Sequence, residues 1–382
     1  MNRASGRRAV VAAASQAVLV LSGLTSGAAA APPPPVLRAI VQQLVKAGSP
    51  GAITVVRTPA SVDRAAAGLG RLDPPTQIRV ADRYRVASVT KTFVATLVLQ
   101  LAAEGKARLS DSVEHWLPGL VPKGRSITLR ELMNHTSGLF DYTEDAGYFR
   151  ARVARPGRLW TPRQLVAIAV QHKLRFPPGT DWAYSNTNYV LLGLVVEAVA
   201  GRSLEHELRN RIFRPLGLRS SSYPFRTALD GRVVHGYVRS IPGVPIPRGE
   251  TLDATSRVAP DGWGAGQIVS NADDLTRFYA ELLGGRLLPP AQLAAMKTTV
   301  RGTHTVLGTQ VLFSAPYGLG LAVERLGCGT AYGHDGDLPG YRNLVLASAD
   351  GRRVVAVLVN VSALRPSWAT IRAAAARAFC SG

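Results

Sequence analysis

The sequence predicts an α/β protein of the α+β kind, in which both ends of the chain build one antiparallel sheet and a mainly helical region lies between them. Two strand-like runs lie near the start, at residues 52–57 and about 65–72. Four more lie near the end, at residues 317–326, 331–334, 341–348 and 353–362. Helical periodicity dominates between them, so the early and late strands are expected to share a sheet that helices flank.

Each helix is predicted from apolar spacing and from a start or stop residue. Residues 36–47 follow a proline linker and end before Gly48, a common helix stop. Residues 88–106 are apolar on most faces, which favours a helix buried in the core. Proline and glycine punctuate shorter helices at residues 128–134, 161–172 and 188–200. Asp350-Gly351 predicts a hairpin turn, and residues 366–379 predict a final helix.

Residues 1–31 have the three parts of a secretory signal peptide. A basic start precedes an apolar stretch from residue 9 to about residue 24, and a run of four alanines precedes Pro32. This stretch is too short for a stable membrane anchor, and no later segment is apolar over the roughly 18 residues that a span needs. We therefore expect a secreted, extracellular or cell-wall-associated protein without a membrane anchor. Residues 32–382 are expected to form one domain, with a sheet part (32–87 and 300–382) and a mainly helical part (88–299).

The composition indicates a globular, basic protein. The 382 residues are 46% hydrophobic and 18% charged, a balance that disordered chains lack, and the net charge is +20. Such a charge favours a polyanionic partner, although an arginine-rich composition alone also produces it. No zinc finger, RNA-binding signature or basic stripe with aromatic residues is present, so we expect no nucleic-acid partner. Glutamates interrupt the densest arginine cluster, at residues 202–219, which is typical of a solvated helix face.

Two cysteines, Cys328 and Cys380, lie near the end of the chain. In an oxidising compartment they would form one disulfide that closes a loop of about 50 residues and stabilises the fold by a few kcal/mol. Two free buried thiols are the alternative.

Lys91 is the most informative of only six lysines in a chain with 45 basic residues. It lies inside the apolar segment, three residues after Ser88, so the amine and the hydroxyl share one helix face. A serine hydroxyl becomes a good nucleophile only when a neighbouring group takes its proton. Ser88 is the only serine with a lysine at this spacing, and a lysine among apolar residues needs a polar partner.

Two further motifs carry groups suited to the same chemistry. Tyr184 and Asn186 lie on a loop, where a phenol beside an ammonium would ionise more easily and an amide would bind a substrate. His334, Asp335 and Gly336 lie at a strand end, before Asp337, where a glycine lets a ligand approach the backbone. Taken alone, each motif is more often structural.

Taken together and in this order, Ser-x-x-Lys, Tyr-x-Asn and His-x-Gly resemble the class C β-lactamase and serine penicillin-binding group. The closest resemblance is to the secreted serine D-alanyl-D-alanine carboxypeptidases. It extends over nearly all of residues 32–382 and includes the segments 85–93, 135–139, 317–321 and 332–336, with Gly340-Tyr341. It implies a β-lactamase/transpeptidase-like fold and a serine hydrolase that works through an acyl-enzyme, without metal or cofactor. The paired cysteines fit it too.

The resemblance also implies roles for individual residues. Ser88 is the acylated nucleophile, Lys91 and Tyr184 share proton transfer, and Asn186 orients the substrate amide. His334 takes the place of the β-lactamase lysine, and the backbone N–H groups of Ser88 and Asp337 form the oxyanion hole, often worth about 3 kcal/mol per donor. Trp263 forms a wall of the acyl-donor pocket or is a packed structural residue.

Three positions depart from the carboxypeptidase pattern. Asp335 and Asp337 replace threonines that help to hold the substrate carboxylate, and Ala322 replaces an arginine, for which Arg325 would have to compensate. Two aspartates facing a carboxylate would repel it by on the order of 1 kcal/mol each. If their side chains point away, an ordinary carboxypeptidase is expected.

We therefore expect D-alanyl-D-alanine carboxypeptidase-type action on peptidoglycan peptides, with β-lactams as acylating inhibitors. The alternative is an esterase or D-amino-acid peptidase or amidase of the same fold. A β-lactamase is less favoured because His334 replaces lysine, and a non-catalytic wall-binding protein is the remaining class.

Overall fold

The computed structural model describes residues 32–225, 231–241, 244, 246–247, 250–257, 262–300, 316–362 and 366–381. The predicted signal peptide, residues 1–31, lies outside this part of the chain. Residues Pro33–Gly382 form one compact unit.

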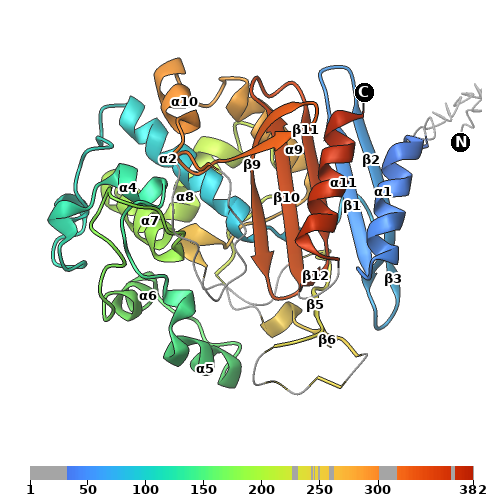
Figure 1. Ribbon diagram of the computed structural model, residues 1–382, viewed down its shortest axis with the longest axis horizontal. Helices are drawn as coiled ribbons and strands as arrows, with labels where there is room; N and C mark the ends of the chain where they lie inside the picture. The colour runs from blue at the N-terminus through green and yellow to red at the C-terminus, as the bar shows by residue number, and fades with distance from the viewer. Residues whose placement is uncertain are drawn as a thin grey trace, which may run out of the picture. The chain divides into compact units, whose positions relative to one another are not determined.

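A seven-stranded antiparallel sheet combines both ends of the chain, as the sequence predicts (Figure 1). The early strands lie at one side of it, and β1 pairs with β11 from the other end of the chain. In order across the sheet the strands are β3 (Thr76–Gln77), β2 (Val62–Arg71), β1 (Gly51–Arg57), β11 (Val354–Val359), β10 (Tyr341–Ser348), β9 (Gly329–Leu338) and β8 (Ala322–Leu326). This part of the fold class is confirmed.

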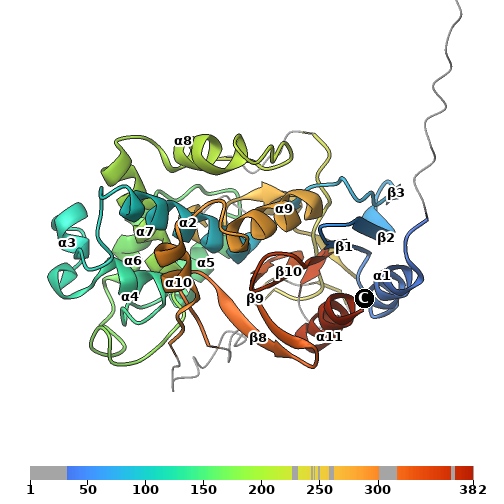
Figure 2. The ribbon, with the colours of Figure 1, turned by 90° about the horizontal axis from the view of Figure 1, so that it is seen from above.

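Side chains alternate between the two faces of the sheet, and each face has its own core. Val355 and Val357 of β11 pack with helices α1 (Pro35–Lys46) and α11 (Trp368–Cys380). Val354, Ala356 and Leu358 face the opposite way, into the larger core that includes α2 (Thr90–Ala103) and α9 (Ala272–Leu283). Figure 2 shows α9 on one side of the sheet and α1 with α11 on the other. The central strands are therefore covered on both faces, which explains their continuous apolar sequence.

The segment between the early and late strands is mainly helical, as expected. Besides α2 and α9, it contains α3 (Val113–Trp116), α4 (Leu129–Met133), α5 (Ala146–Ala154), α6 (Pro162–Ala169), α7 (Asn186–Ala200), α8 (Leu204–Leu208) and α10 (Pro290–Lys297). Thr128 and Thr161 cap α4 and α6 as capping boxes, so both helices begin one residue after the predicted start.

Short turns and small sheets connect these helices. One small sheet has the strand order β12 (Val361–Ser362), β5 (Tyr237–Val238) and β6 (Leu252–Asp253). A second pairs β4 (Tyr84–Arg85) with β7 (Val269–Ser270). The single-turn elements are η1 (Ala87–Val89), η2 (Gly124–Ser126), η3 (Tyr142–Glu144), η4 (Arg209–Phe213), η5 (Thr255–Arg257) and η6 (Trp263–Ala265).

The strand predicted from residue 317 begins later, at Ala322. Gly320 has a φ of +77° and Gly318 donates its N–H to the Leu321 carbonyl at 2.7 Å, so a turn at residues 318–321 precedes the strand. In contrast, β9 is longer than predicted. It continues past His334 to Leu338 because β10 pairs with every residue of that stretch.

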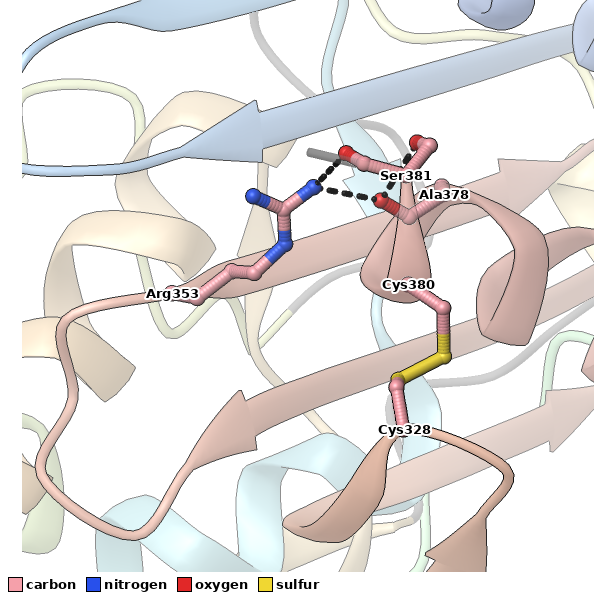
Figure 3. The surroundings of a disulfide bond; sticks show 5 residues. All are labelled: Cys328, Arg353, Ala378, Cys380 and Ser381. Carbon is pink, nitrogen blue, oxygen red and sulfur yellow. Dashed lines mark hydrogen bonds between the residues drawn. A yellow bond between two sulfur atoms is a disulfide. The ribbon is translucent and has the colours of Figure 1, made fainter.

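The predicted disulfide joins Cys328 to Cys380, 52 residues apart (Figure 3). It connects the β8–β9 hairpin to the end of α11. Arg353 donates to the Ala378 carbonyl at 3.0 Å and to that of Ser381, which holds the same helix end. Within the described ranges, each helix is too short or too polar to cross a bilayer.

Candidate active site

Ser88 lies on η1, a single turn between β4 and α2. The preceding residue, Ala87, has a φ of +53°, in the left-handed region that residues with a side chain rarely adopt. Backbone contacts hold this turn: Val86 donates to the Ile268 carbonyl at 3.0 Å, and Ile268 donates to the Thr90 hydroxyl at 3.1 Å. Ser88 is partly exposed while the residues on either side of it are buried. The turn therefore presents one hydroxyl to an incoming molecule.

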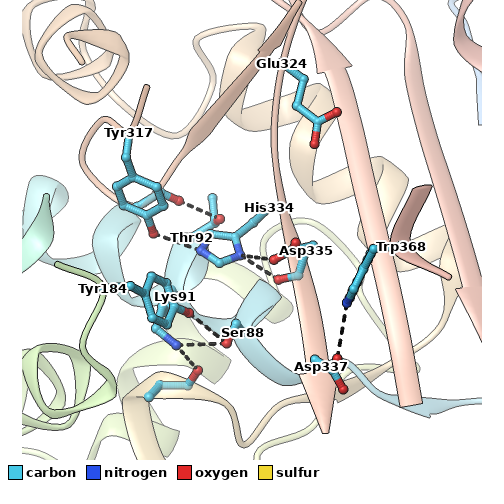
Figure 4. A network of polar contacts seen from close by, with 12 residues as sticks. Ser88, Lys91, Thr92, Tyr184, Tyr317, Glu324, His334, Asp335, Asp337 and Trp368 are labelled. Atoms are coloured by element: carbon cyan, nitrogen blue, oxygen red, sulfur yellow. Dashed lines mark hydrogen bonds and ion pairs between the residues drawn. The ribbon is translucent and has the colours of Figure 1, made fainter. Parts of the chain in front are cut away.

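The Lys91 amine is buried and donates to Ser88 Oγ at 2.9 Å (Figure 4). It makes two more hydrogen bonds, to Asn186 Oδ1 at 2.8 Å and to the Ala265 carbonyl at 2.7 Å. Burial lowers the pKa of Lys91 to about 7, although the charges of Asp141 and Asp335 oppose the shift. A neutral amine has two N–H donors and one lone pair. The two carbonyl oxygens accept the donors, so the lone pair is free to take the Ser88 proton.

The Tyr184 hydroxyl donates to Ser88 Oγ at 2.9 Å, so the tyrosine joins the serine and lysine as predicted. Burial raises the pKa of Tyr184 well above its usual value, and the hydrogen bond to Ser88 only partly opposes this. The expectation that the neighbouring lysine makes this phenol easier to ionise is therefore wrong. Tyr184 is a neutral donor here, and Lys91 is the group poised to accept a proton.

Asn186 begins α7, and its side-chain amide lies between Lys91 and a residue that the sequence did not reveal. Its Oδ1 faces Lys91, while its Nδ2 donates to the Asp141 carboxylate at 2.8 Å. One Nδ2 hydrogen remains for a substrate carbonyl. Asp141 lies two residues beyond the 135–139 motif, and that proximity is the signal in the sequence that could have identified it.

Gly336 brings strand β9 against the nucleophile. A Cβ atom here would lie 2.3 Å from the Val86 carbonyl oxygen and 3.2 Å from the Ser88 nitrogen, so only glycine permits this approach. Leu338 pairs with Tyr341 across a two-residue loop, and N–H groups alternate along a strand. The Asp337 N–H therefore points away from β10. Since the pairing of β8 with β9 ends at Gly333, this N–H lies on the edge of β9 that β8 leaves uncovered, and its part in an oxyanion hole stays a prediction.

His334 is buried and linked to Tyr317 rather than to Ser88. Its Nδ1 donates to the Asp335 carbonyl at 2.6 Å, so its Nε2 accepts from the Tyr317 hydroxyl at 2.8 Å. Burial and the nearby Lys91 lower the pKa of His334 to about 3. Where β-lactamases carry a lysine, this chain therefore places a neutral imidazole.

The Asp335 and Asp337 side chains point away from Ser88, which corrects the expectation that they repel a substrate carboxylate. Both lie on the face of the sheet that packs against α11, because they alternate with His334 and Gly336. Asp335 pairs with Arg372 at 3.0 Å. Asp337 pairs with Arg342 at 3.1 Å and accepts from Trp368 Nε1 at 3.3 Å, toward which it turns in Figure 4. Burial raises the pKa of both carboxyls.

Arg325 does not compensate for the arginine that Ala322 replaces. Arg325 lies three residues beyond Ala322 on β8, which corresponds to about 10 Å at strand spacing. In the sheet it lies opposite Thr330, near the β8–β9 turn. This end of the hairpin is the one remote from Gly336.

Trp263 is anchored by structural contacts at the border of the site. Its Nε1 donates to the Trp160 carbonyl at 3.0 Å, and its ring packs against Phe225. Two residues later, Ala265 supplies a carbonyl to Lys91. Trp263 thus supports η6, and its contact with a substrate stays a prediction.

His135 is a second residue that only a motif pointed to. It is buried, its ring packs beside Tyr184, and its Nδ1 accepts from the Ser185 N–H at 3.1 Å. Burial lowers the pKa of His135 well below its usual value, so a neutral ring supports the tyrosine loop. The described residues contain no cluster of three or more His, Cys, Asp or Glu placed to hold a metal.

A buried lysine and a phenol that converge on one serine, beside the edge of β9, form the arrangement that acyl transfer through a serine requires. The comparisons agree. The family model described as Beta-lactamase matches residues 37–378, and the chain belongs to this family.

Relatives in this family include penicillin-binding proteins and D-aminopeptidases. Penicillin-binding protein 4 of Amycolatopsis lactamdurans is 30% identical over 84% of this chain and 83% of its own length. The D-aminopeptidase of Brucella anthropi is 28% identical over 82% of this chain, which spans 56% of that relative. The chain also spans only 64% of Penicillin-binding protein 4* of Bacillus subtilis.

Among solved structures, a D-stereospecific amidohydrolase from Streptomyces sp. is similar with a TM-score of 0.79 and 36% identity, over 90% of this chain and 98% of that one. These similarities show the β-lactamase-like fold.

Proposed function

We propose that this protein hydrolyses amides of small D-amino-acid derivatives that lack a free C-terminal carboxylate, through an acyl-enzyme on Ser88. The observation that supports this most directly is the neutral character of the site. Ser88 Oγ contacts the Lys91 amine and the Tyr184 phenol, the Asn186 amide lies beside Lys91, and burial keeps the His334 imidazole neutral. Among the residues that the structure describes, a free carboxylate would therefore lack the ion pair that a carboxypeptidase site offers.

The acyl-transfer step follows from the hydrogen bonds at Ser88. The serine proton moves to the neutral Lys91 amine as Oγ bonds to the substrate carbonyl carbon, and the Ser88 and Asp337 N–H groups stabilise the oxyanion. When the carbon–nitrogen bond breaks, Tyr184 gives its proton to the leaving amine and recovers one from Lys91. Water then hydrolyses the ester, with the neutral Lys91 again taking the proton.

The preference for D-amino-acid amides rests on the relatives, among which a D-stereospecific amidohydrolase and a D-aminopeptidase share most of this chain. A D-alanyl-D-alanine carboxypeptidase is the second candidate. It is favoured by one observation, the outward turn of Asp335 and Asp337, which leaves a substrate carboxylate without a repelling partner.

Kinetics on matched substrates distinguish the two candidates. We expect kcat/KM for a D-alanyl-D-alanine peptide amide to exceed that for the free carboxylate by roughly tenfold, and D-amino-acid amides to exceed their L-enantiomers. Ser88→Ala should abolish turnover of both. A strong preference for the free carboxylate would instead establish the carboxypeptidase.

A further inference from the structure

Asp141 is a buried carboxylate close to the catalytic lysine. Packing alone gives no reason for a charged side chain at this buried position. Asp141 is only 3% exposed. Its Oδ2 accepts from the backbone and side-chain nitrogens of Asn186, at 3.0 and 2.8 Å. Its Oδ1 accepts from the backbone and hydroxyl of Thr143, at 3.0 and 2.8 Å. The carboxylate thus has four donors, and all of them are uncharged N–H or O–H groups of Asn186 and Thr143.

The loop that carries Asp141 is fixed to the start of α7. The Thr187 hydroxyl donates to the Phe140 carbonyl at 2.7 Å and accepts from the Tyr142 N–H at 3.2 Å. Ser185, the N-cap residue of α7, makes no side-chain capping bond, so Asp141 from another segment satisfies the first N–H of the helix. Capping is a structural role, and any catalytic role must be tested against it.

The Asn186 amide connects Asp141 to Lys91. Its nitrogen donates to Asp141, which leaves its oxygen facing the Lys91 amine at 2.8 Å. A rotated amide would present an N–H donor to the protonated lysine and an oxygen to the carboxylate, and both contacts would be repulsive. We propose, on the basis of the function proposed above, that Asp141 is a positioning residue: it fixes the orientation of Asn186 and acts through that amide as counter-charge to the protonated Lys91.

The other groups around Lys91 do not supply this charge as directly. Asp335, on β9, is paired with Arg372. Burial keeps the other titratable side chains around Lys91 neutral. These are His135, Tyr184, Tyr189 and His334. Of the two carboxylates near Lys91, Asp141 is therefore the one without a cationic partner among the described residues. Its negative charge stabilises the ammonium that forms when Lys91 accepts the serine proton.

Acylation by a fluorescent penicillin, measured from pH 5 to 9, tests this proposal. For the wild type, the rate should rise through about pH 7 as Lys91 loses its proton. Asp141→Asn removes the charge, so the midpoint should fall by about one pH unit and the limiting rate by roughly tenfold. The matched control is Thr143→Val, which removes one donor to the same carboxylate but keeps its charge. Its midpoint should stay at the wild-type value.

A purely structural role gives a different result. If Asp141 only caps α7, Asp141→Asn lowers the melting temperature but leaves the midpoint and the limiting rate of acylation unchanged, and the proposal is wrong. If that variant does not fold, Asp141→Glu replaces it. The longer carboxylate keeps the charge but displaces Asn186, so the midpoint should stay near that of the wild type while the rate falls. A wild-type rate would overturn the positioning role.

Penicillin acylation does not depend on the identity of the natural substrate. Labelling that is normal in the wild type without any amide hydrolysis would refute the proposed function and still permit this test.

Discussion

At the scale of the residue, the chemistry depends on how the site satisfies Lys91 in two protonation states. As an ammonium, its three hydrogens have three acceptors, Ser88 Oγ, Asn186 Oδ1 and the Ala265 carbonyl. As a neutral amine, it keeps the two carbonyl acceptors and receives the serine proton. Moving the proton therefore leaves no hydrogen of the buried amine without an acceptor. An arginine could not replace this lysine, since it does not release a proton.

The pH dependence of the reaction follows from the same geometry. Since the neutral amine is the active form and burial lowers the pKa of Lys91 to about 7, kcat/KM should rise with pH through about 7 and then level off. Lys91→Met, which keeps the volume but cannot take a proton, should lower kcat/KM by roughly 10³-fold and remove this limb. Initial rates on one amide substrate from pH 5 to 9 check both. A Met variant that keeps the same limb would exclude Lys91 as the base.

Ser88, Lys91 and Tyr184 were predictable because spacing and chemistry identify them, and the structure brings them within hydrogen-bond distance. The directions of Asp335 and Asp337 were not predictable. Strand alternation shows that they share a face, but which face lies toward the nucleophile depends on the partners of β9, and these are distant in sequence. The ionisation of Tyr184 was misjudged because the sequence does not reveal how completely the phenol is buried.

At the scale of the element, the site depends on β9 lying directly against η1. The sequence predicted the strands of the sheet well, because β-branched and apolar runs mark them. It ended β9 too early, since the polar residues after His334 do not look like a strand until β10 pairs with them. The left-handed Ala87 was not predictable, because tertiary contacts from residue 268 hold that turn in place.

Gly336→Ala tests this packing. The added methyl group would approach the Val86 carbonyl oxygen to 2.3 Å and the Ser88 nitrogen to 3.2 Å, so β9 must move away from η1. We expect acylation to slow by roughly 10²-fold, which is the usual effect of losing one oxyanion donor. Gly327→Ala is the control, since its added methyl group meets no atom within 4 Å. Equal acylation rates in the two variants would contradict the role of this approach.

At the scale of the whole molecule, the sheet joins the two ends of the chain and the disulfide fixes the last helix to it. The net charge of +20 is compatible with an anionic cell wall, and export stays a prediction because residues 1–31 lie outside the described part of the chain. The fold class was predictable because strands at both ends of a chain, with helices between them, have few ways to bury their apolar faces.

The disulfide should contribute measurably to stability. A closed loop of 52 residues corresponds to about 4 kcal/mol of unfolding free energy. Replacing Cys328 and Cys380 with serine should therefore lower the melting temperature by on the order of 5 °C. Reduction of the wild type by dithiothreitol should reproduce the shift, while the double variant should not respond. An unchanged melting temperature would show that the bond contributes nothing.

The central claim is that Ser88 carries the acyl group. Trapping the protein with a fluorescent penicillin, followed by proteolysis and mass spectrometry of the labelled peptide, tests it most directly. The adduct mass should fall on Ser88 and disappear in Ser88→Ala. An adduct on another residue, or labelling that persists unchanged in Ser88→Ala, would contradict the account.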